Sequence, residues 1–148
     1  RLSRAGYTIA IATNQSGLGR GYFGIDELEA IHSLLQQQVE ELDGHIEGIF
    51  YCPHLPEEGC QCRKPATGLL TAIEAELGQS PRGSFFIGDS VKDLQAAKAF
   101  GCQPMLVRTG KGNASLAALA EGCAAVAEAA AIPVYDDLAA AVQAILLQ

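Results

Sequence analysis

Residues 84–100 read SFFIGDSVKDLQAAKAF, a short apolar run followed by a helical pattern. The run at 84–87 predicts a buried strand, because it is short and apolar and ends at a glycine. The segment at 93–100 predicts a helix, and a polar turn at 88–90 separates it from the strand. This order of strand, turn and helix is the repeating unit of α/β proteins.

The same order recurs along the chain. We expect strands at 7–13, 46–51, 84–87, 104–107 and 132–135, and helices at 26–42, 68–77, 93–100, 116–121 and 137–147. The helix at 26–42 gives the clearest signal, since spacings of three and four make one apolar face from Leu28, Ile31, Leu35, Val39 and Leu42. Alternating strands and helices predict parallel pairing, hence a three-layer, Rossmann-like α/β fold with a mostly parallel sheet. The length of 148 residues suits one domain, residues 1–148.

Composition and charge exclude several classes of function. A net charge of −7 removes the electrostatic attraction on which binding to nucleic acid or anionic lipid depends. No stretch supplies the roughly 20 strongly apolar residues of a membrane span. A small phosphorylated partner stays compatible with this charge, because local cations act within a screening length of about 8 Å. The first residues show no signal-peptide core, and an odd number of cysteines, 5, suits the reducing cytoplasm.

Residues 52–65 read CPHLPEEGCQCRKP and contain a candidate metal site. Zinc prefers four thiolate or imidazole ligands in a tetrahedron, and the loop at 52–62 offers such a set in Cys52, His54, Cys60 and Cys62. Four protein ligands leave no position for water, so the zinc is expected to be structural. A disulfide would leave the histidine unexplained, and a coincidental group of reduced cysteines is the remaining alternative.

Polar side chains follow the predicted strands at the carboxyl ends, where parallel sheets bind ligands. Thr13 ends a strand and is followed by Asn14, Gln15 and Ser16, so a hydroxyl and several amides suit an oxyanion, although ordinary turn chemistry is an alternative. Downstream of the next strand, Lys64 can stabilise a transferring phosphoryl group and Arg63 can bind a second anionic group. An adjacent Arg-Lys pair on a solvated surface is the simpler interpretation.

The turn at 88–90 adds an acidic group to this set. Asp89 stands where a carboxylate can reach a divalent cation that bridges to phosphate. Asp93 lies in the first turn of the following helix, where it either caps amides and holds the turn or acts directly. A hydroxyl, a lysine and an acidic turn on successive strand ends form a more specific pattern than any of them alone.

These residues resemble the motifs of the haloacid-dehalogenase-like (HAD-like) phosphatases. Thr13 resembles the second motif of that family, Lys64 the third, and residues 88–93 the fourth. Within the family, residues 13–23 (TNQSGLGRGYF), the cysteine loop and residues 108–112 (RTGKG) are similar to the group of heptose bisphosphate and histidinol-phosphate phosphatases, which share the zinc loop.

The resemblance implies a magnesium-dependent phosphatase that acts through an aspartyl-phosphate. Its implied reaction removes the 7-phosphate of D-glycero-D-manno-heptose 1,7-bisphosphate in lipopolysaccharide heptose biosynthesis, with histidinol phosphate as the alternative substrate. The implied roles are phosphoryl stabilisation by Thr13 and Lys64, substrate binding by Asn14, Gln15, Ser16 and Arg63, and magnesium binding by Asp89 with support from Asp93. The implied partner is a small phosphorylated sugar, and we expect a monomer.

The first motif of the family, Asp-x-Asp at the end of the first strand, does not occur in this sequence. We expect it upstream of Arg1, in a strand and helix of about 30–40 residues. Since that motif supplies the nucleophile and the acid/base, we predict that residues 1–148 alone do not hydrolyse the substrate. A non-catalytic, zinc-stabilised module that binds a phosphorylated ligand is the alternative from another class.

Overall fold

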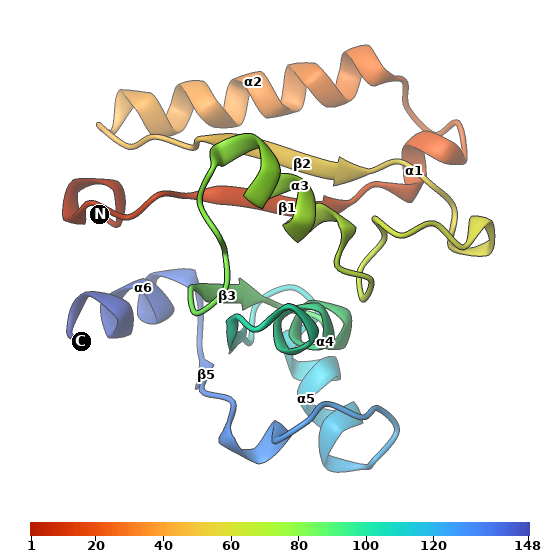
Figure 1. The fold of residues 1–148 in the computed structure, drawn as a ribbon, viewed down its shortest axis with the longest axis vertical. Coiled ribbons are helices and arrows are strands. Elements are labelled where there is room, and N and C mark those ends of the chain that lie inside the picture. Colours follow the sequence, from red (N-terminus) through yellow and green to blue (C-terminus); the bar gives the residue numbers. More distant parts are fainter. The chain divides into compact units, whose positions relative to one another are not determined.

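The computed structural model describes residues 1–148. The chain divides into two compact units, Arg1–Gln79 and Ser80–Gln148, and each is described by itself. In Figure 1 the first unit is coloured from red to green and the second from green to blue.

The first unit is built on a two-stranded parallel sheet. Its strands are β1 (Ala10–Asn14) and β2 (Gly48–Cys52), and its helices are α1 (Ser16–Gly19), α2 (Ile25–Glu41) and α3 (Gly68–Leu77), with 3-10 turns at Ser3–Ala5 and Pro56–Glu58. The register sets Thr13 opposite Tyr51 and Asn14 opposite Cys52. The end of β1 therefore lies beside the residue at which the cysteine-containing loop begins.

Helix α2 buries less of its apolar face than its sequence pattern predicts. Leu28 is 2% exposed, but Ile31 is 61% exposed and Leu42 is 77% exposed. The structure confirms the predicted helix, and the outer part of its apolar face is exposed. The acidic side chain of Glu27 accepts a hydrogen bond from the backbone N–H of Gly24 at 2.9 Å, which fixes the amino-terminal end.

The second unit is built on a three-stranded parallel sheet in the order β3-β4-β5. The strands are β3 (Phe85–Gly88), β4 (Gln103–Val107) and β5 (Val134–Tyr135), and the helices are α4 (Val91–Phe100), α5 (Gly112–Ala120) and α6 (Leu138–Leu146), with a 3-10 turn at Ala129–Ala131. β4 is the central strand, and four of its five residues are buried. Leu94, Leu106 and Ile132 form the core cluster between sheet and helices.

The structure confirms the predicted α/β class with parallel strands. Helix α3 has the predicted bounds, and α5 begins earlier than predicted, at Gly112. The last strand is shorter than predicted, because Pro133 has no N–H for the ladder and contributes only its carbonyl, which accepts from the N–H of Leu106 at 3.0 Å. The strands form two hydrogen-bonded sheets, one in each unit, where one sheet was expected.

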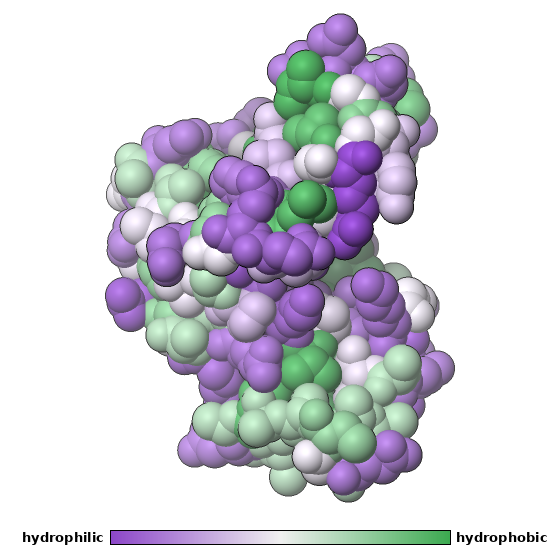
Figure 2. Space-filling model, turned by 90° about the vertical axis from the view of Figure 1, so that its right-hand side faces the viewer, coloured by the Kyte–Doolittle hydropathy of each residue, from purple (hydrophilic) through white to green (hydrophobic).

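Every helix is too short or too polar to cross a membrane. The longest, α2, has 17 residues and carries acidic side chains in its first turn. On the face shown in Figure 2, hydrophobic residues in green are interspersed with hydrophilic residues in purple.

Candidate functional site

The end of β1 presents the hydroxyl of Thr13. This residue is half-buried, and its Oγ1 accepts a hydrogen bond from Nε2 of Gln15 at 3.1 Å. A hydroxyl that accepts in this way keeps its own proton for donation to an anion. Ser16 begins α1 and is also half-buried. The predicted residues of this turn are thus gathered at the carboxyl end of one strand.

Lys64 is brought to the same strand end. Its Nζ donates to the backbone carbonyl of Ala12 at 2.7 Å, and its backbone N–H donates to Oδ1 of Asn14 at 3.0 Å. In return, Nδ2 of Asn14 donates to the carbonyl of Lys64 at 3.2 Å. The structure therefore places the predicted lysine next to the strand that carries Thr13, as a phosphoryl-binding pair requires.

Arg63, the neighbour of this lysine, has two buried guanidinium nitrogens without a hydrogen-bond partner in the chain, Nε and Nη1. Buried polar groups are nearly always hydrogen-bonded, and a buried charged donor without a partner is costly. A guanidinium in this state is suited to an anionic ligand, because its forked donors match carboxylate and phosphate oxygens.

The predicted metal ligands lie together in the first unit. The donor atoms of Cys52, His54, Cys60 and Cys62 are all within 4.8 Å of one another. The Sγ atom of Cys62 is 3.0 Å from Sγ of Cys52 and 3.2 Å from Nδ1 of His54. A tetrahedral zinc with metal–sulfur bonds of about 2.3 Å places its ligand atoms roughly 3.8 Å apart, so the four groups fit such an ion after a small expansion. All four come from one loop, and none of the cysteines forms a disulfide.

The thiols of this cluster influence one another electrostatically. Burial, together with the adjacent thiols of Cys52 and Cys60, raises the pKa of Cys62 to about 12. Burial also raises the pKa of Cys60. Hydrogen bonds from the backbone of Arg63 and from the neighbouring thiols outweigh this effect and lower the pKa of Cys60 to about 6. Closely spaced thiolates oppose one another's ionisation, and a divalent cation removes that conflict. The charge arrangement therefore also fits a metal ion.

In the second unit, Asp89 follows the last residue of β3. Its Oδ2 accepts a hydrogen bond from the backbone N–H of Lys111 at 2.9 Å, whereas Oδ1 makes no hydrogen bond within the chain. Gly110, which has a φ of +60°, lies so close that a Cβ there would collide with Oδ2 of Asp89. The loop after β4 thus fixes one carboxylate oxygen and leaves the other for a cation such as magnesium, which prefers oxygen ligands.

The turn that carries Asp89 is held by a capping box. Asp93 is 6% exposed, and its Oδ2 accepts from the backbone N–H groups of Asp89 and Ser90 at 3.2 and 3.1 Å. In exchange, Oγ of Ser90 accepts from the N–H of Asp93 at 3.2 Å. Asp93 therefore organises the backbone that presents Asp89.

Ser115 on α5 completes this arrangement, and the sequence reasoning missed it. The side chain is buried, and its Oγ donates to the backbone carbonyl of Asp89 at 2.8 Å. Its only sequence signal is a single hydroxyl in an alanine-rich helix, and such a signal does not identify a partner.

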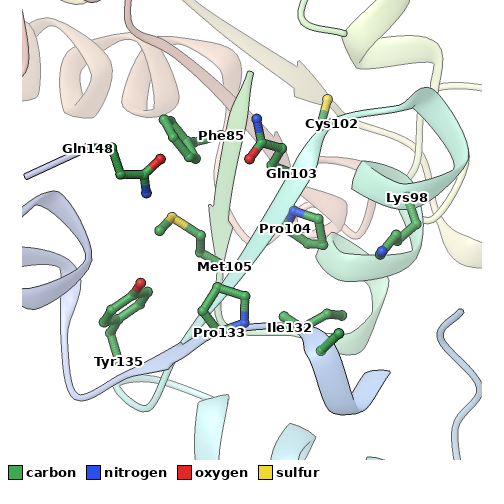
Figure 3. Close-up of a pocket in the computed structure, with 11 residues that line it drawn as sticks. Phe85, Lys98, Cys102, Gln103, Pro104, Met105, Ile132, Pro133, Tyr135 and Gln148 are labelled. Carbon is green, nitrogen blue, oxygen red and sulfur yellow. The ribbon is translucent and has the colours of Figure 1, made fainter. Parts of the chain in front are cut away.

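The structure also contains two cavities, one in each unit. One, of about 270 Å³, lies in the first unit beside Thr13 and Gln15, but most of its wall is apolar, from Ile11, Phe23, Leu28, Ile31, Leu35 and Ile49. The other, also about 270 Å³, lies at the first residues of β3 and β4 in the second unit, where Phe85, Gln103, Met105 and Tyr135 surround it (Figure 3). The second cavity contains none of the predicted site residues.

Comparison with known proteins places these features in a family. The model of a family described as HAD-hydrolase-like matches residues 61–141, more than half of the chain. The chain is 48% identical over 147 residues to the D-glycero-beta-D-manno-heptose-1,7-bisphosphate 7-phosphatase of Pseudomonas aeruginosa, with 99% of the chain and 78% of that protein covered. A phosphatase of the same name from Neisseria meningitidis is 44% identical over 115 residues, which cover 78% of the chain and 62% of the relative.

A similar solved structure is the D,D-heptose 1,7-bisphosphate phosphatase of Bordetella bronchiseptica, complexed with magnesium and phosphate. It matches with a TM-score of 0.88 and 41% identity, over 99% of this chain and 78% of that one. The corresponding enzyme from Burkholderia thailandensis gives a TM-score of 0.73 at 32% identity, over 99% of this chain and 80% of that one.

Proposed function

Because the chain belongs to the HAD-like hydrolases, in the group of the heptose 1,7-bisphosphate 7-phosphatases, we propose that it supplies the phosphate-binding and metal-binding residues of such an enzyme. The proposed reaction is hydrolysis of the 7-phosphate ester of D-glycero-β-D-manno-heptose 1,7-bisphosphate to heptose 1-phosphate and inorganic phosphate. The observation that carries the proposal is the placement of Lys64 at the end of β1, where its Nζ donates to the carbonyl of Ala12 beside Thr13.

Each side chain has a proposed role. Thr13 and Lys64 donate to the phosphoryl oxygens. Arg63 binds the other anionic group of the substrate. Asn14, Gln15 and Ser16 shape the end of β1. Oδ1 of Asp89 is the proposed oxygen ligand of magnesium. A bound magnesium ion would neutralise charge that develops on the phosphoryl group.

Zinc has a separate role in this proposal. The residues that would hold it are Cys52, His54, Cys60 and Cys62, and their number leaves no position for substrate or water. When bound, the ion would stabilise a loop that has few buried residues of its own and that ends at Lys64.

We also propose that residues 1–148 do not hydrolyse the phosphate ester when they are assayed alone. Phosphoryl transfer in this family uses a carboxylate nucleophile from an Asp-x-Asp sequence, and the chain contains none. Positioning and charge stabilisation alone give no aspartyl-phosphate. The proposed working form is a monomer in the cytoplasm, where reducing conditions keep the loop thiols able to bind zinc.

A chimera tests the proposed reaction. It adds to the chain those residues of the Pseudomonas aeruginosa relative that lie outside the aligned region. We expect phosphate release from the heptose bisphosphate with a kcat/KM at least about tenfold above that for histidinol phosphate, because pocket contacts discriminate substrates. Equal or reversed preference would overturn the substrate assignment.

The control for this assay is the same chimera with Lys64→Ala, which must lose most of its activity. Its loss shows that the measured hydrolysis depends on this chain and not on the added segment alone. Phosphate release by the unextended chain would contradict the proposal that a further carboxylate is required.

A further inference from the structure

We propose that Asn14 is a positioning residue for Lys64. Its side-chain amide fixes the backbone of the lysine to the carboxyl end of β1, so that the amine is held there by the strand and not by the metal loop alone. The importance of Lys64 for hydrolysis rests on the proposed function, but the positioning by Asn14 rests on contacts within the first unit.

The two residues form a reciprocal pair. Oδ1 of Asn14 accepts from the N–H of Lys64 at 3.0 Å, and Nδ2 of Asn14 donates to the carbonyl of Lys64 at 3.2 Å. One side chain thus satisfies both backbone groups of a residue that is 50 positions away. A donor and an acceptor in one planar amide fix direction as well as distance, because both bonds must form in the same orientation.

The position of Asn14 in the sheet explains why this pair constrains the lysine. Asn14 is the last residue of β1 and lies opposite Cys52 on β2. The next backbone N–H, that of Gln15, donates to the carbonyl of Cys52 at 2.8 Å. The end of β1 is therefore tied to both ends of the loop at 52–64, at Cys52 by the backbone ladder and at Lys64 by the asparagine.

This arrangement separates two functions in the loop. The four metal ligands organise its interior, and Asn14 fixes its last residue. Nζ of Lys64 also donates to the carbonyl of Ala12 on β1. The backbone and the side-chain amine of the lysine are therefore both hydrogen-bonded to the same strand. Loss of the asparagine amide should therefore release the lysine backbone even when zinc is bound.

The test uses the full 148-residue chain, labelled with ¹³C and ¹⁵N and loaded with zinc. In Asn14→Ala, the hydrogen exchange of the Lys64 amide should accelerate about tenfold, the effect of losing roughly one net hydrogen bond. Asn14→Asp keeps the acceptor and should restore part of the protection. Asn14→Leu fills similar space without an acceptor and should not restore it.

The matched control is Asn113→Ala, which removes an exposed asparagine whose side chain accepts a 3.4 Å hydrogen bond from Arg108. It should leave the Lys64 amide unchanged, and all variants should still bind one zinc. Protection that is restored by Asn14→Leu, or unchanged in Asn14→Ala, would show that the side chain only fills space.

A second measurement needs no variant and covers the case in which Asn14→Ala does not fold. In the wild-type chain, a scalar coupling across the hydrogen bond should connect the ¹⁵N of Lys64 with the side-chain carbonyl carbon of Asn14. Absence of this coupling, with the Lys64 amide exchanging freely, would overturn the proposal. Neither readout involves substrate, so failure of the phosphatase assay would leave the positioning result intact.

Discussion

The loop at 52–64 and the turn at 88–93 are both proposed to handle phosphate chemistry, but different interactions hold them. In the first, residues 56–59 are exposed, and the side chains that converge are the four candidate metal ligands. In the second, Asp93 and Ser90 cap each other, and Ser115 fixes the carbonyl of Asp89. The turn satisfies its polar groups with hydrogen bonds from its own residues and from α5 and the loop after β4, whereas the loop is proposed to need an ion to hold three thiols together.

The largest effect is expected from Lys64, the residue of the loop that is proposed to contact the phosphoryl group. In the chimera, Lys64→Ala should reduce kcat by about 100-fold or more, with a smaller change in KM, because a charge aimed at the transition state is lost. Steady-state kinetics on heptose 1,7-bisphosphate measure both constants. Lys98→Ala, which removes the cation paired with Glu128, is the control and should leave kcat unchanged. A change confined to KM would make Lys64 an anchor for the ground state only.

Metal content tests the loop directly. We expect one zinc per chain, and Cys62→Ser should lose most of it, because a hydroxyl is a far weaker zinc ligand than a thiolate. The matched control is Cys123→Ser, which changes an exposed cysteine outside the cluster and should keep its zinc. Elemental analysis of the purified variants gives the answer. A wild-type chain that is fully folded without any metal would remove the stated difference between loop and turn.

The turn at 88–93 should respond to added bulk at Gly110, which packs against Asp89. Gly110→Ala forces a side chain into a left-handed backbone position and against Oδ2 of Asp89, whereas Gly122→Ala meets the same backbone strain with nothing within 4 Å. The control should therefore lose about 1 kcal/mol of unfolding free energy, and Gly110→Ala clearly more. Denaturant unfolding of both variants measures the difference. Equal losses would show that contact with Asp89 does not constrain the loop after β4.

The smallest effect is expected from a surface pair of the second unit that lies in neither region. Nζ of Lys98 is 2.9 Å from Oε2 of Glu128, and its hydrogen bond and charge lower the pKa of Glu128. Because the folded pKa is lowered, the pair stabilises the fold above the ordinary glutamate pKa, and this contribution disappears as pH falls through the lowered value. Glu128→Gln should thus slightly lower the melting temperature at neutral pH and have no effect in strong acid.

That comparison is read from melting curves of the two proteins over a range of pH. The pair is exposed, so the difference should be small even at neutral pH. A difference that grows as pH falls would mean that Glu128 acts through something other than its charge.

The sequence predicted those parts of the molecule that depend on near neighbours. The candidate metal ligands lie within a few residues of one another, and Thr13 and Asp89 lie at the ends of apolar runs, so spacing and strand ends singled them out as candidates. The structure then brought the four ligands together.

The contacts that the sequence could not predict join distant residues. Asn14 pairs with Lys64 across 50 positions, and Ser115 reaches Asp89 across 26. No periodicity encodes such pairs, because they depend on how strands and helices pack after folding. For the same reason the spacing in α2 predicted an apolar face but not how much of that face is buried, because burial depends on what covers the helix, and Ile31 is exposed.

Hydrogen exchange of the chain with and without zinc tests the contrast between the two regions most directly. After removal of the ion with a chelator, amides at 53–62 should exchange much faster, while those at 88–93 and 110–115 should keep their rates. Equal acceleration in both regions, or none in either, would contradict the claim that only the loop depends on zinc for its local structure.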